Sequence, residues 1–338
     1  MPAAFLSILI VGTAAQSAIA ADTVIYKTAK DPAVQATVTG EIVDFAGGQL
    51  SIRNEVGVQQ TIPAERVVEI RSDATAAETA ADQLAREGKF EEAVKNYQQA
   101  VRDEKRVWVQ RQVMAKLVGT YCQLEQFDSA GDAFLSLLRN DPQTHHFAVI
   151  PLSWMVHSPS PQLAQRAAVW MSQTQNSVSV LLGASWLLST SQRAAASASL
   201  QRLITDRDPR VAMLAQTQLW RTRTATATVE EVEGWEAWLA RLPADLRAGP
   251  YFALGQAWSA RGQSDKSALA HLRVPILYGQ DRRLVASALL LAGRELEKIG
   301  QREEAVTLYR EVVREHAAAP AAVEARGRLE ELAGRENE

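Results

Sequence analysis

The chain has 338 residues, with 36 basic and 39 acidic side chains and a formal net charge of −3. A chain of this length can bury a sizeable core in two or three domains. The near balance of charge argues against a protein that coats nucleic acid or anionic membrane, since such proteins usually carry a basic excess. The single cysteine, Cys122, excludes an intramolecular disulfide framework and a cysteine-rich metal site.

Residues 1–20 are expected to form a secretory signal peptide. Residues 1–21 contain no charged side chain, Phe5–Val11 is strongly apolar, and Ala18-Ile19-Ala20 places small residues where a signal peptidase cuts. The apolar stretch is shorter than the roughly 20 residues of a spanning helix, so cleavage is favoured and an uncleaved anchor is the alternative. The mature protein is expected to be exported, periplasmic or associated with the cell envelope, and not stably inserted in a membrane.

Residues 22–72 are predicted to form a small β module. Five runs are expected to form strands: the apolar run Val24–Tyr26, the alternating stretch Val34–Phe45, and the runs Leu50–Arg53, Val58–Ile62 and Arg66–Arg71. Glycine-rich turns separate them, which is typical of a small closed or half-closed barrel. Pro63 cannot donate to a β ladder, so a single helical turn is expected before the last strand.

This layout resembles SH3-like and Sm-like barrels in its strand count, in Gly40, in the Gly47-Gly48 turn and in the short turn before the last strand. Some such barrels bind RNA or proline-rich peptides. Residues 22–72 carry five basic and seven acidic side chains, and their only aromatic residues are Tyr26 and Phe45. This composition does not favour phosphate contacts or base stacking. The module is therefore expected to be structural or to contact protein, and no nucleic-acid partner is expected.

A repeated helical pattern starts at residue 74, where apolar residues begin to recur with a helical period. Three segments align: Gly88-Lys89-Phe90-Glu91-Glu92-Ala93, Glu125-Gln126-Phe127-Asp128-Ser129-Ala130 and Gly300-Gln301-Arg302-Glu303-Glu304-Ala305. Each alanine is followed four residues later by an aromatic residue, namely Tyr97, Phe134 and Tyr309. A looser copy contains Gly262, Ser267 and His271. Each copy predicts two antiparallel helices joined by a turn.

These units resemble the tetratricopeptide repeat (TPR), with TPR-like repeats over 74–142 and 246–338 and a C-terminal capping helix over Ala321–Leu332. The resemblance implies an α-solenoid that binds other proteins or peptides in a concave groove lined by the first helix of each pair. Carried over residue by residue, it implies groove positions at Glu78, Asp82, Arg86, Gln112, Ala115, Gly119, Gln123, Arg294, Glu297 and Lys298.

Residues 143–245 are predicted to form degenerate, Arg-rich helical repeats. Helices are expected over Ala164–Met171, Val180–Leu188 and Arg210–Trp220, with a loop at Ser158-Pro159-Ser160-Pro161. The gap between the recognised units leaves room for three or four helix pairs, and one continuous solenoid is favoured over two separate domains.

The middle region also has an unusual charge. Residues 143–229 contain seven Arg and two Asp but no Lys or Glu. Because guanidinium groups form two-pronged pairs with carboxylates, this region is a candidate for docking an acidic partner or a carboxylate-bearing ligand. The alternative is solvated helix faces whose arginines have intramolecular partners.

Tryptophan is abundant, with eight in the chain, and is common both in cores and at interfaces. Trp235 and Trp238 are three residues apart on one helix face, which makes them the best candidates for exposed anchors, although core packing is the favoured interpretation.

No catalytic or metal-binding signature is found. Gly-x-Ser-x-Gly, His-Glu-x-x-His and phosphate-loop motifs are absent from the sequence. His145 and His146 are adjacent, so their side chains diverge, and no metal site is expected. Catalytic residues and cofactors are not expected either.

The sequence therefore predicts a mainly α protein, an α-solenoid of TPR-like helix pairs preceded by a small five-stranded β-barrel-like module. The expected function is that of an exported, non-enzymatic scaffold for protein–protein interaction in cell-envelope assembly. The alternative is a ligand- or carbohydrate-binding protein, including a carbohydrate-active one, that uses the Trp-rich middle region.

Overall fold

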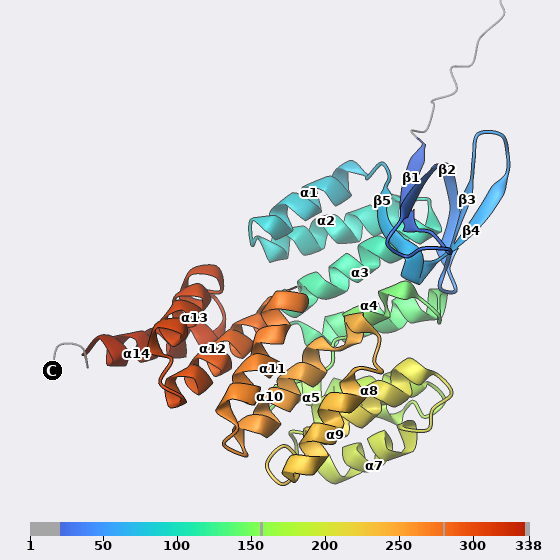
Figure 1. Cartoon of the computed structure of the whole chain (residues 1–338). Coiled ribbons are helices and arrows are strands. Elements are labelled where there is room, and N and C mark those ends of the chain that lie inside the picture. Colours follow the sequence, from blue (N-terminus) through green and yellow to red (C-terminus); the bar gives the residue numbers. More distant parts are fainter. Residues whose placement is uncertain (1–20, 156–157, 280, 335–338) are drawn as a thin grey trace, which may run out of the picture. The chain divides into compact units, whose positions relative to one another are not determined.

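A computed structural model describes residues 21–155, 158–279 and 281–334 (Figure 1). The described part contains five β-strands followed by fourteen α-helices, which confirms the mainly α fold with an N-terminal β module. The chain divides into two compact units, residues 1–74 and residues 75–338. All fourteen α-helices of the described part lie in the second unit. The expected signal peptide, residues 1–20, lies outside the described residues.

The first unit is a five-stranded antiparallel sheet with the strand order β4-β3-β2-β1-β5. Its strands are β1 (Asp22–Lys27), β2 (Gln35–Ala46), β3 (Gln49–Arg53), β4 (Gln59–Pro63) and β5 (Val67–Arg71). The expected helical turn after Pro63 is the 3-10 helix η1 (Ala64–Arg66).

Strand β2 is shared between two parts of this sheet. Its first half pairs with β1 as far as Gly40, and its second half pairs with β3. A Cβ atom at Gly40 would collide with the backbone of Arg53, so glycine permits the close approach there. The side chains of Val24, Leu50 and Ile52, on one face of the sheet, are fully buried.

The second unit is built from helices joined by short connections. The helices are α1 (Ala76–Arg86), α2 (Phe90–Asp103), α3 (Val107–Gln123), α4 (Phe127–Asn140), α5 (Pro161–Ser172), α6 (Ser177–Leu187), α7 (Arg193–Leu203), α8 (Pro209–Trp220), α9 (Val229–Leu239), α10 (Ala248–Ser259), α11 (Ser264–Leu277), α12 (Arg282–Lys298), α13 (Arg302–Glu315) and α14 (Pro320–Gly334), with 3-10 helices η2 (His145–Val149) and η3 (Ala244–Leu246). None of the helices in the described ranges is long and apolar enough to cross a membrane.

Four helix pairs, α1/α2, α3/α4, α10/α11 and α12/α13, share one turn. In every pair, the turn residue that lies two positions before the second helix has a positive φ. These residues are Gly88 (77°), Glu125 (59°), Gly262 (68°) and Gly300 (79°). The N–H of the next residue returns to the first helix, for example Gln301 N to Leu296 O at 2.9 Å. This is the left-handed helix end that glycine favours. The loosest sequence copy therefore has the same turn as the clearest ones.

Each of these pairs also buries a ring at the same position of its second helix. The residue nine positions after the turn residue is Tyr97, Phe134, His271 or Tyr309, and each of these side chains is buried. At Gly293, a Cβ atom would lie 2.5 Å from Cε1 of Tyr309, and at Gly255 it would lie 2.6 Å from the His271 ring. In these two pairs, a glycine on the first helix therefore makes room for a ring on the second.

The middle region contains fewer helix pairs than the three or four expected. The described residues between α4 and α10 form the pairs α5/α6 and α7/α8 and the single helix α9. The expected helices are confirmed, and Asp208 caps α8 by accepting a hydrogen bond from Arg210 N. The missing length is used by residues 141–155 and 158–160, which are mostly non-helical.

We predict that Gly293→Ala lowers the free energy of unfolding by about 1–3 kcal/mol, because the added methyl group overpacks the Tyr309 ring. Gly327→Ala is the matched control in α14, where nothing lies within 4 Å of a Cβ atom. It should stabilise the protein by about 0.5–1 kcal/mol through helix propensity. Chemical denaturation measures both values. A Gly293→Ala protein as stable as wild type would contradict the packing contact.

We also predict that the free energy of unfolding depends on pH because of His271. Burial lowers the pKa of His271 to about 4, and the charge of Glu295 opposes this only in part. Because the unfolded chain binds the proton near pH 6.5 and the folded chain does not, stability is lost as the pH falls from 6.5 towards 4.

The test is His271→Phe, which places at this position the type of ring found at Phe134. We expect the loss of unfolding free energy between pH 7 and pH 5 to shrink by about 2 kcal/mol relative to wild type. Denaturation curves at the two pH values measure it. An unchanged pH dependence would show that the imidazole is not held neutral.

Candidate protein-binding groove

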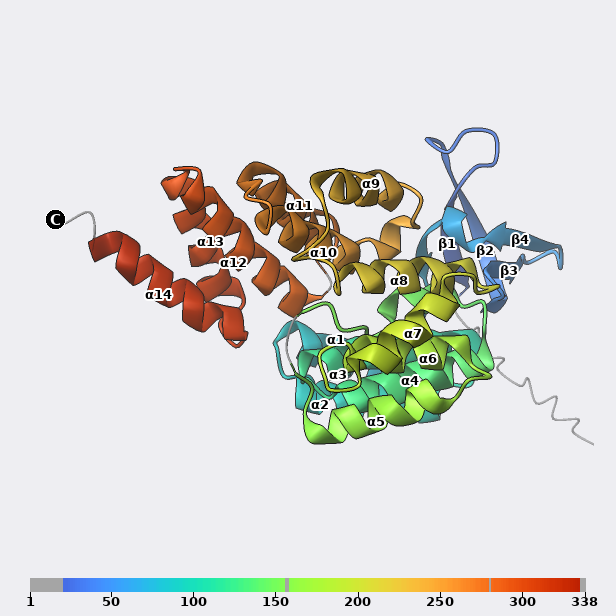
Figure 2. The same cartoon turned by 90° about the horizontal axis from the view of Figure 1, so that it is seen from below.

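Alternate helices of the second unit form a continuous inner row. Helix α6 packs on α8, α8 on α10, α10 on α12 and α12 on α14 (Figure 2). Residues from α3 and from four of these helices line one pocket of about 190 Å³. The surface that a TPR-like array would offer to a partner is therefore centred on this pocket.

An extended segment of the chain, residues 150–155, crosses the interior beside the inner row. Ser153 N donates to Ser185 Oγ at 2.8 Å, and Gln218 Nε2 donates to Ser153 O at 3.2 Å. Trp186 Nε1 donates to Pro151 O at 2.9 Å. Side chains of α6 and α8 thus satisfy peptide groups that have no helix or sheet partner. An extended backbone is held here by side chains of the inner row.

Trp154 links the two hydrophobic cores of this unit. One core extends from Ala115 to Ala270 and the other from Phe252 to Leu332, and Trp154 packs against both. A Cβ atom at Gly249, in α10, would collide with its indole ring. The crossing segment therefore fixes the middle helices to the C-terminal ones.

The walls of the pocket are mostly apolar. They include Phe127, Leu152, Trp154, Trp186 and Leu284. The rings of Phe127 and Trp186 are 4.6 Å apart.

Cys122 also lines the pocket, and burial, followed by the charge of Asp281, raises the pKa of its thiol far above the usual range. The thiol stays protonated, so it behaves as a small apolar group and not as a nucleophile.

Charged groups stand at the edge of the pocket. The Arg283 guanidinium lies 5.1 Å from the centre of the Phe127 ring and pairs with Glu125 at 3.2 Å. Asp245 and Asp281 are solvent-accessible, yet desolvation by the surrounding walls raises the pKa of both carboxyl groups. Two carboxylates and one arginine that is already paired leave a net acidic rim.

Two of the expected groove residues in α1 are held in an ion cluster. Lys116 Nζ lies 2.9 Å from Glu78 Oε1 and 2.8 Å from Asp82 Oδ2, and Glu78 is 3% exposed. Burial disfavours the charged ammonium group, but these two carboxylates outweigh it and raise the pKa of Lys116. Glu78 and Asp82 therefore join α1 to α3. Arg86 is exposed.

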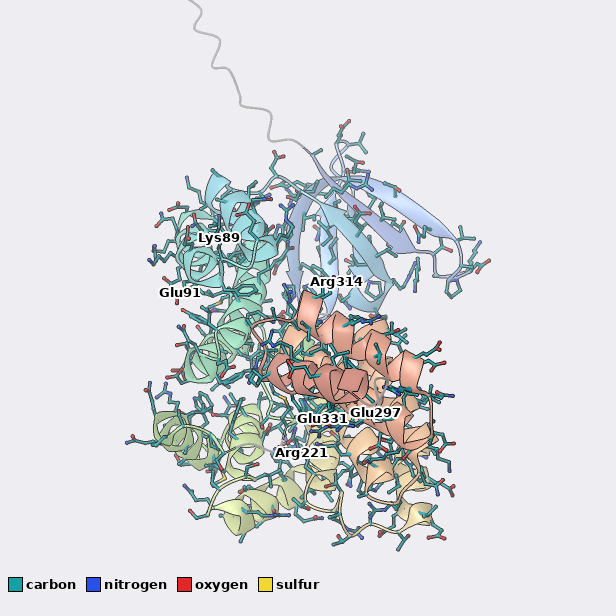
Figure 3. The ribbon with its side chains drawn as sticks, turned by 90° about the vertical axis from the view of Figure 1, so that its left-hand side faces the viewer. Lys89, Glu91, Arg221, Glu297, Arg314 and Glu331 are labelled. Atoms are coloured by element: carbon teal, nitrogen blue, oxygen red, sulfur yellow. The ribbon has the colours of Figure 1, made fainter. Side chains whose placement is uncertain are left out.

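The three expected groove residues of α12 are also paired within the chain. Arg294 pairs with Glu324, Glu297 pairs with Arg328, and Lys298 pairs with Glu295 at 2.6 Å. Arg328 also contacts Glu331, and Figure 3 labels both of its acidic partners. Helix α14 thus supplies partners for two of the three residues.

Among the expected groove positions of α3, Gly119 and Gln123 line the pocket. Ala115 is buried and Gln112 is half-buried. The structure adds residues that the repeat pattern missed, in segments 148–155, 245–249 and 281–284. The sequence signal for these was weak, because they lie between helices where no repeat position is defined.

The prediction that Trp235 is an exposed anchor is wrong, because this residue is 9% exposed and belongs to the core. It stacks on Trp220 with ring centres 5.0 Å apart. Trp238 is half-buried and meets Trp220 edge-on at 5.6 Å. Both residues face α8, so this tryptophan pair packs α9 against α8. This agrees with core packing and not with exposed anchors.

Comparison with known proteins assigns no family. No protein-family model matches the chain, and no curated protein is significantly similar to it.

We predict that Lys116→Gln destabilises the protein by about 2 kcal/mol, because it leaves the buried Glu78 carboxylate without a cation and next to Asp82. Lys95→Gln in α2 is the control, since Lys95 is exposed and has no ion pair among the described residues. Unfolding free energies are compared at pH 7. Equal stability of the two variants would mean that the cluster does not hold α1 to α3.

Proposed function

We propose that this protein is an exported, non-enzymatic scaffold that binds extended protein segments along its inner row of helices, in cell-envelope assembly. One observation carries the proposal. The inner row already holds an extended segment, residues 150–155, through side chains that bond to its backbone. An open pocket lies directly beside that segment.

The repeated architecture supports a TPR-like mode of binding. Four helix pairs share the same turn and bury a ring at the same position after it, and in two of them the ring packs against a glycine of the first helix. Such arrays stack in one direction and present a continuous surface to a partner. Export is supported by the composition of residues 1–20. The β module is proposed as a structural or protein-contacting unit.

The pocket favours a particular kind of peptide. Its volume of about 190 Å³ is below the roughly 300–1,000 Å³ of typical small-molecule sites. It is closer to the ~150 Å³ engineered cavity that accepts benzene, so it suits one apolar side chain. The rim carries Asp245 and Asp281, while Arg283 is paired with Glu125. The proposed partner segment has an apolar residue next to a basic one.

The carbohydrate-binding alternative has less support. Trp154 and Trp186 line the pocket, but the Trp186 indole N–H is already bonded to Pro151 O. Trp170, Trp220 and Trp258 are at most 3% exposed and belong to the core. The Trp-rich middle region therefore packs helices, and its rings do not converge on a sugar-sized cleft.

The test uses a variant whose new side chain fills the pocket. Gly119 is in α3, lines the pocket and has nothing within 4 Å of a Cβ atom, so Gly119→Leu should occupy the space without a backbone clash. Gly234→Leu in α9 is the matched control, with equally free surroundings. Binding is measured on an array of peptides. We expect wild type and Gly234→Leu to select peptides with adjacent apolar and basic residues, and Gly119→Leu to bind them at least tenfold more weakly.

Asp245→Asn should reduce the preference for a basic neighbour while keeping the preference for the apolar residue. Affinity capture from the native envelope fraction with the same three proteins then identifies the natural partner. Peptide binding that Gly119→Leu leaves unchanged would reject this pocket. A soluble glycan that raises the melting temperature, with no peptide selected, would reject the scaffold in favour of the alternative.

A further inference from the structure

A second pocket of about 390 Å³ lies between the end of α6 and the end of α8. Its lining includes two arginines, Arg193 and Arg221, and the hydroxyl-bearing residues Ser189, Thr190 and Thr222. No acidic residue lines it within the described part of the chain. This pocket is chemically opposite to the apolar, acid-rimmed pocket beside residues 150–155.

Arg221 is a buried and fixed cation. Its side chain, labelled in Figure 3, belongs to a residue that is 9% exposed. Its Nη1 donates to Ser185 O at 2.9 Å and to Gln218 Oε1 at 2.6 Å, and its Nη2 faces Met155 O at 3.4 Å. These partners are neutral, and its Nε has none among the described residues. No described carboxylate balances the charge of this guanidinium.

Arg193 brings a second positive charge to the same pocket. It is exposed, and its Nη2 donates to Thr222 O at 3.1 Å, which places the guanidinium beside the end of α8. As the first residue of α7, it adds to the positive end of the helix dipole. Burial first, and then the charge of Arg193, lower the pKa of Arg221 to about 10. The two cations therefore repel each other.

Three of the other five arginines in residues 143–229 are neutralised by carboxylates within the chain, whereas Arg202 and Arg207 have no ion pair among the described residues. Arg166 pairs with Asp132, Arg210 with Asp208 and Arg223 with Glu231. Arg193 and Arg221 have no such carboxylate among the described residues, although they lie together. Holding like charges together without an anion costs free energy that a bound anion would recover.

We propose that this pocket binds an oxyanion, the carboxylate or phosphate group of a ligand, between the guanidinium groups of Arg193 and Arg221. The hydroxyl of Ser189, which makes no hydrogen bond to a described residue, supplies a further donor. Thr190 and Thr222 donate their hydroxyl hydrogens to Leu187 O and Leu219 O, so they offer the anion no further donor. The site is independent of the peptide pocket, because the two share no lining residue.

The test is isothermal titration of the purified chain with inorganic phosphate and, separately, with acetate, at an ionic strength kept constant with sodium chloride. We expect saturable binding of at least one of the two anions. Binding of phosphate alone assigns a phosphorylated ligand, binding of acetate alone assigns a carboxylate ligand, and binding of both supports a general oxyanion site. Saturation by neither anion would overturn the proposal.

Variants locate the site. Arg193→Gln should weaken binding about tenfold or more, the loss of one charged hydrogen-bonded contact. Arg193→Lys should recover part of the affinity, because it keeps the charge but not the planar fork. Arg223→Gln is the matched control, because Arg223 is an exposed arginine that lies in the turn after α8 and is already paired with Glu231. This variant should bind like wild type. Equal affinity of Arg193→Gln and Arg223→Gln would show that the anion binds elsewhere and would reject the site.

Discussion

The helical unit depends on how residues 151–155 are hydrogen-bonded inside it. An extended backbone in a helical interior has no ladder of its own, and an unpaired buried peptide group costs free energy. Ser185, Trp186, Gln218 and Arg221 supply the partners. Each of these side chains comes from α6 or α8 or from the residue that follows α8. The position of the segment and the position of these helices therefore determine one another.

The two pockets are consequences of that crossing. On one side, the segment contributes Leu152 and Trp154 to an apolar pocket whose rim is acidic. On the other side, Arg221 is held by carbonyl and amide oxygens in place of a carboxylate, so its charge remains uncompensated next to Arg193. One structural feature thus creates an apolar site and a cationic site with different chemistry.

Ion pairs within the chain also determine which charged side chains of the repeat surface are already occupied. In a helical array, groups on the first helices can meet a partner or can meet each other. Glu78, Asp82 and Glu297 do the latter, through Lys116 and Arg328. These pairs join α1 to α3 and α12 to α14, so they connect neighbouring helix pairs of the array. Of the expected groove positions, Gly119 and Gln123 line the pocket in the middle of the unit.

Local residue patterns were enough to predict the five strands, the turn after Pro63, the shared turns at Gly88 and Gly300, and most helices. These features follow from glycine, proline and apolar period, which act within a few residues. The number of middle helix pairs, the burial of Trp235 and the lining of both pockets depended on contacts between distant segments. Position in a repeat says which side of a helix a residue occupies, but not whether another part of the chain covers it. Only the tertiary structure shows that Arg221 contacts residues more than 60 positions away and stands beside Arg193 without a described carboxylate.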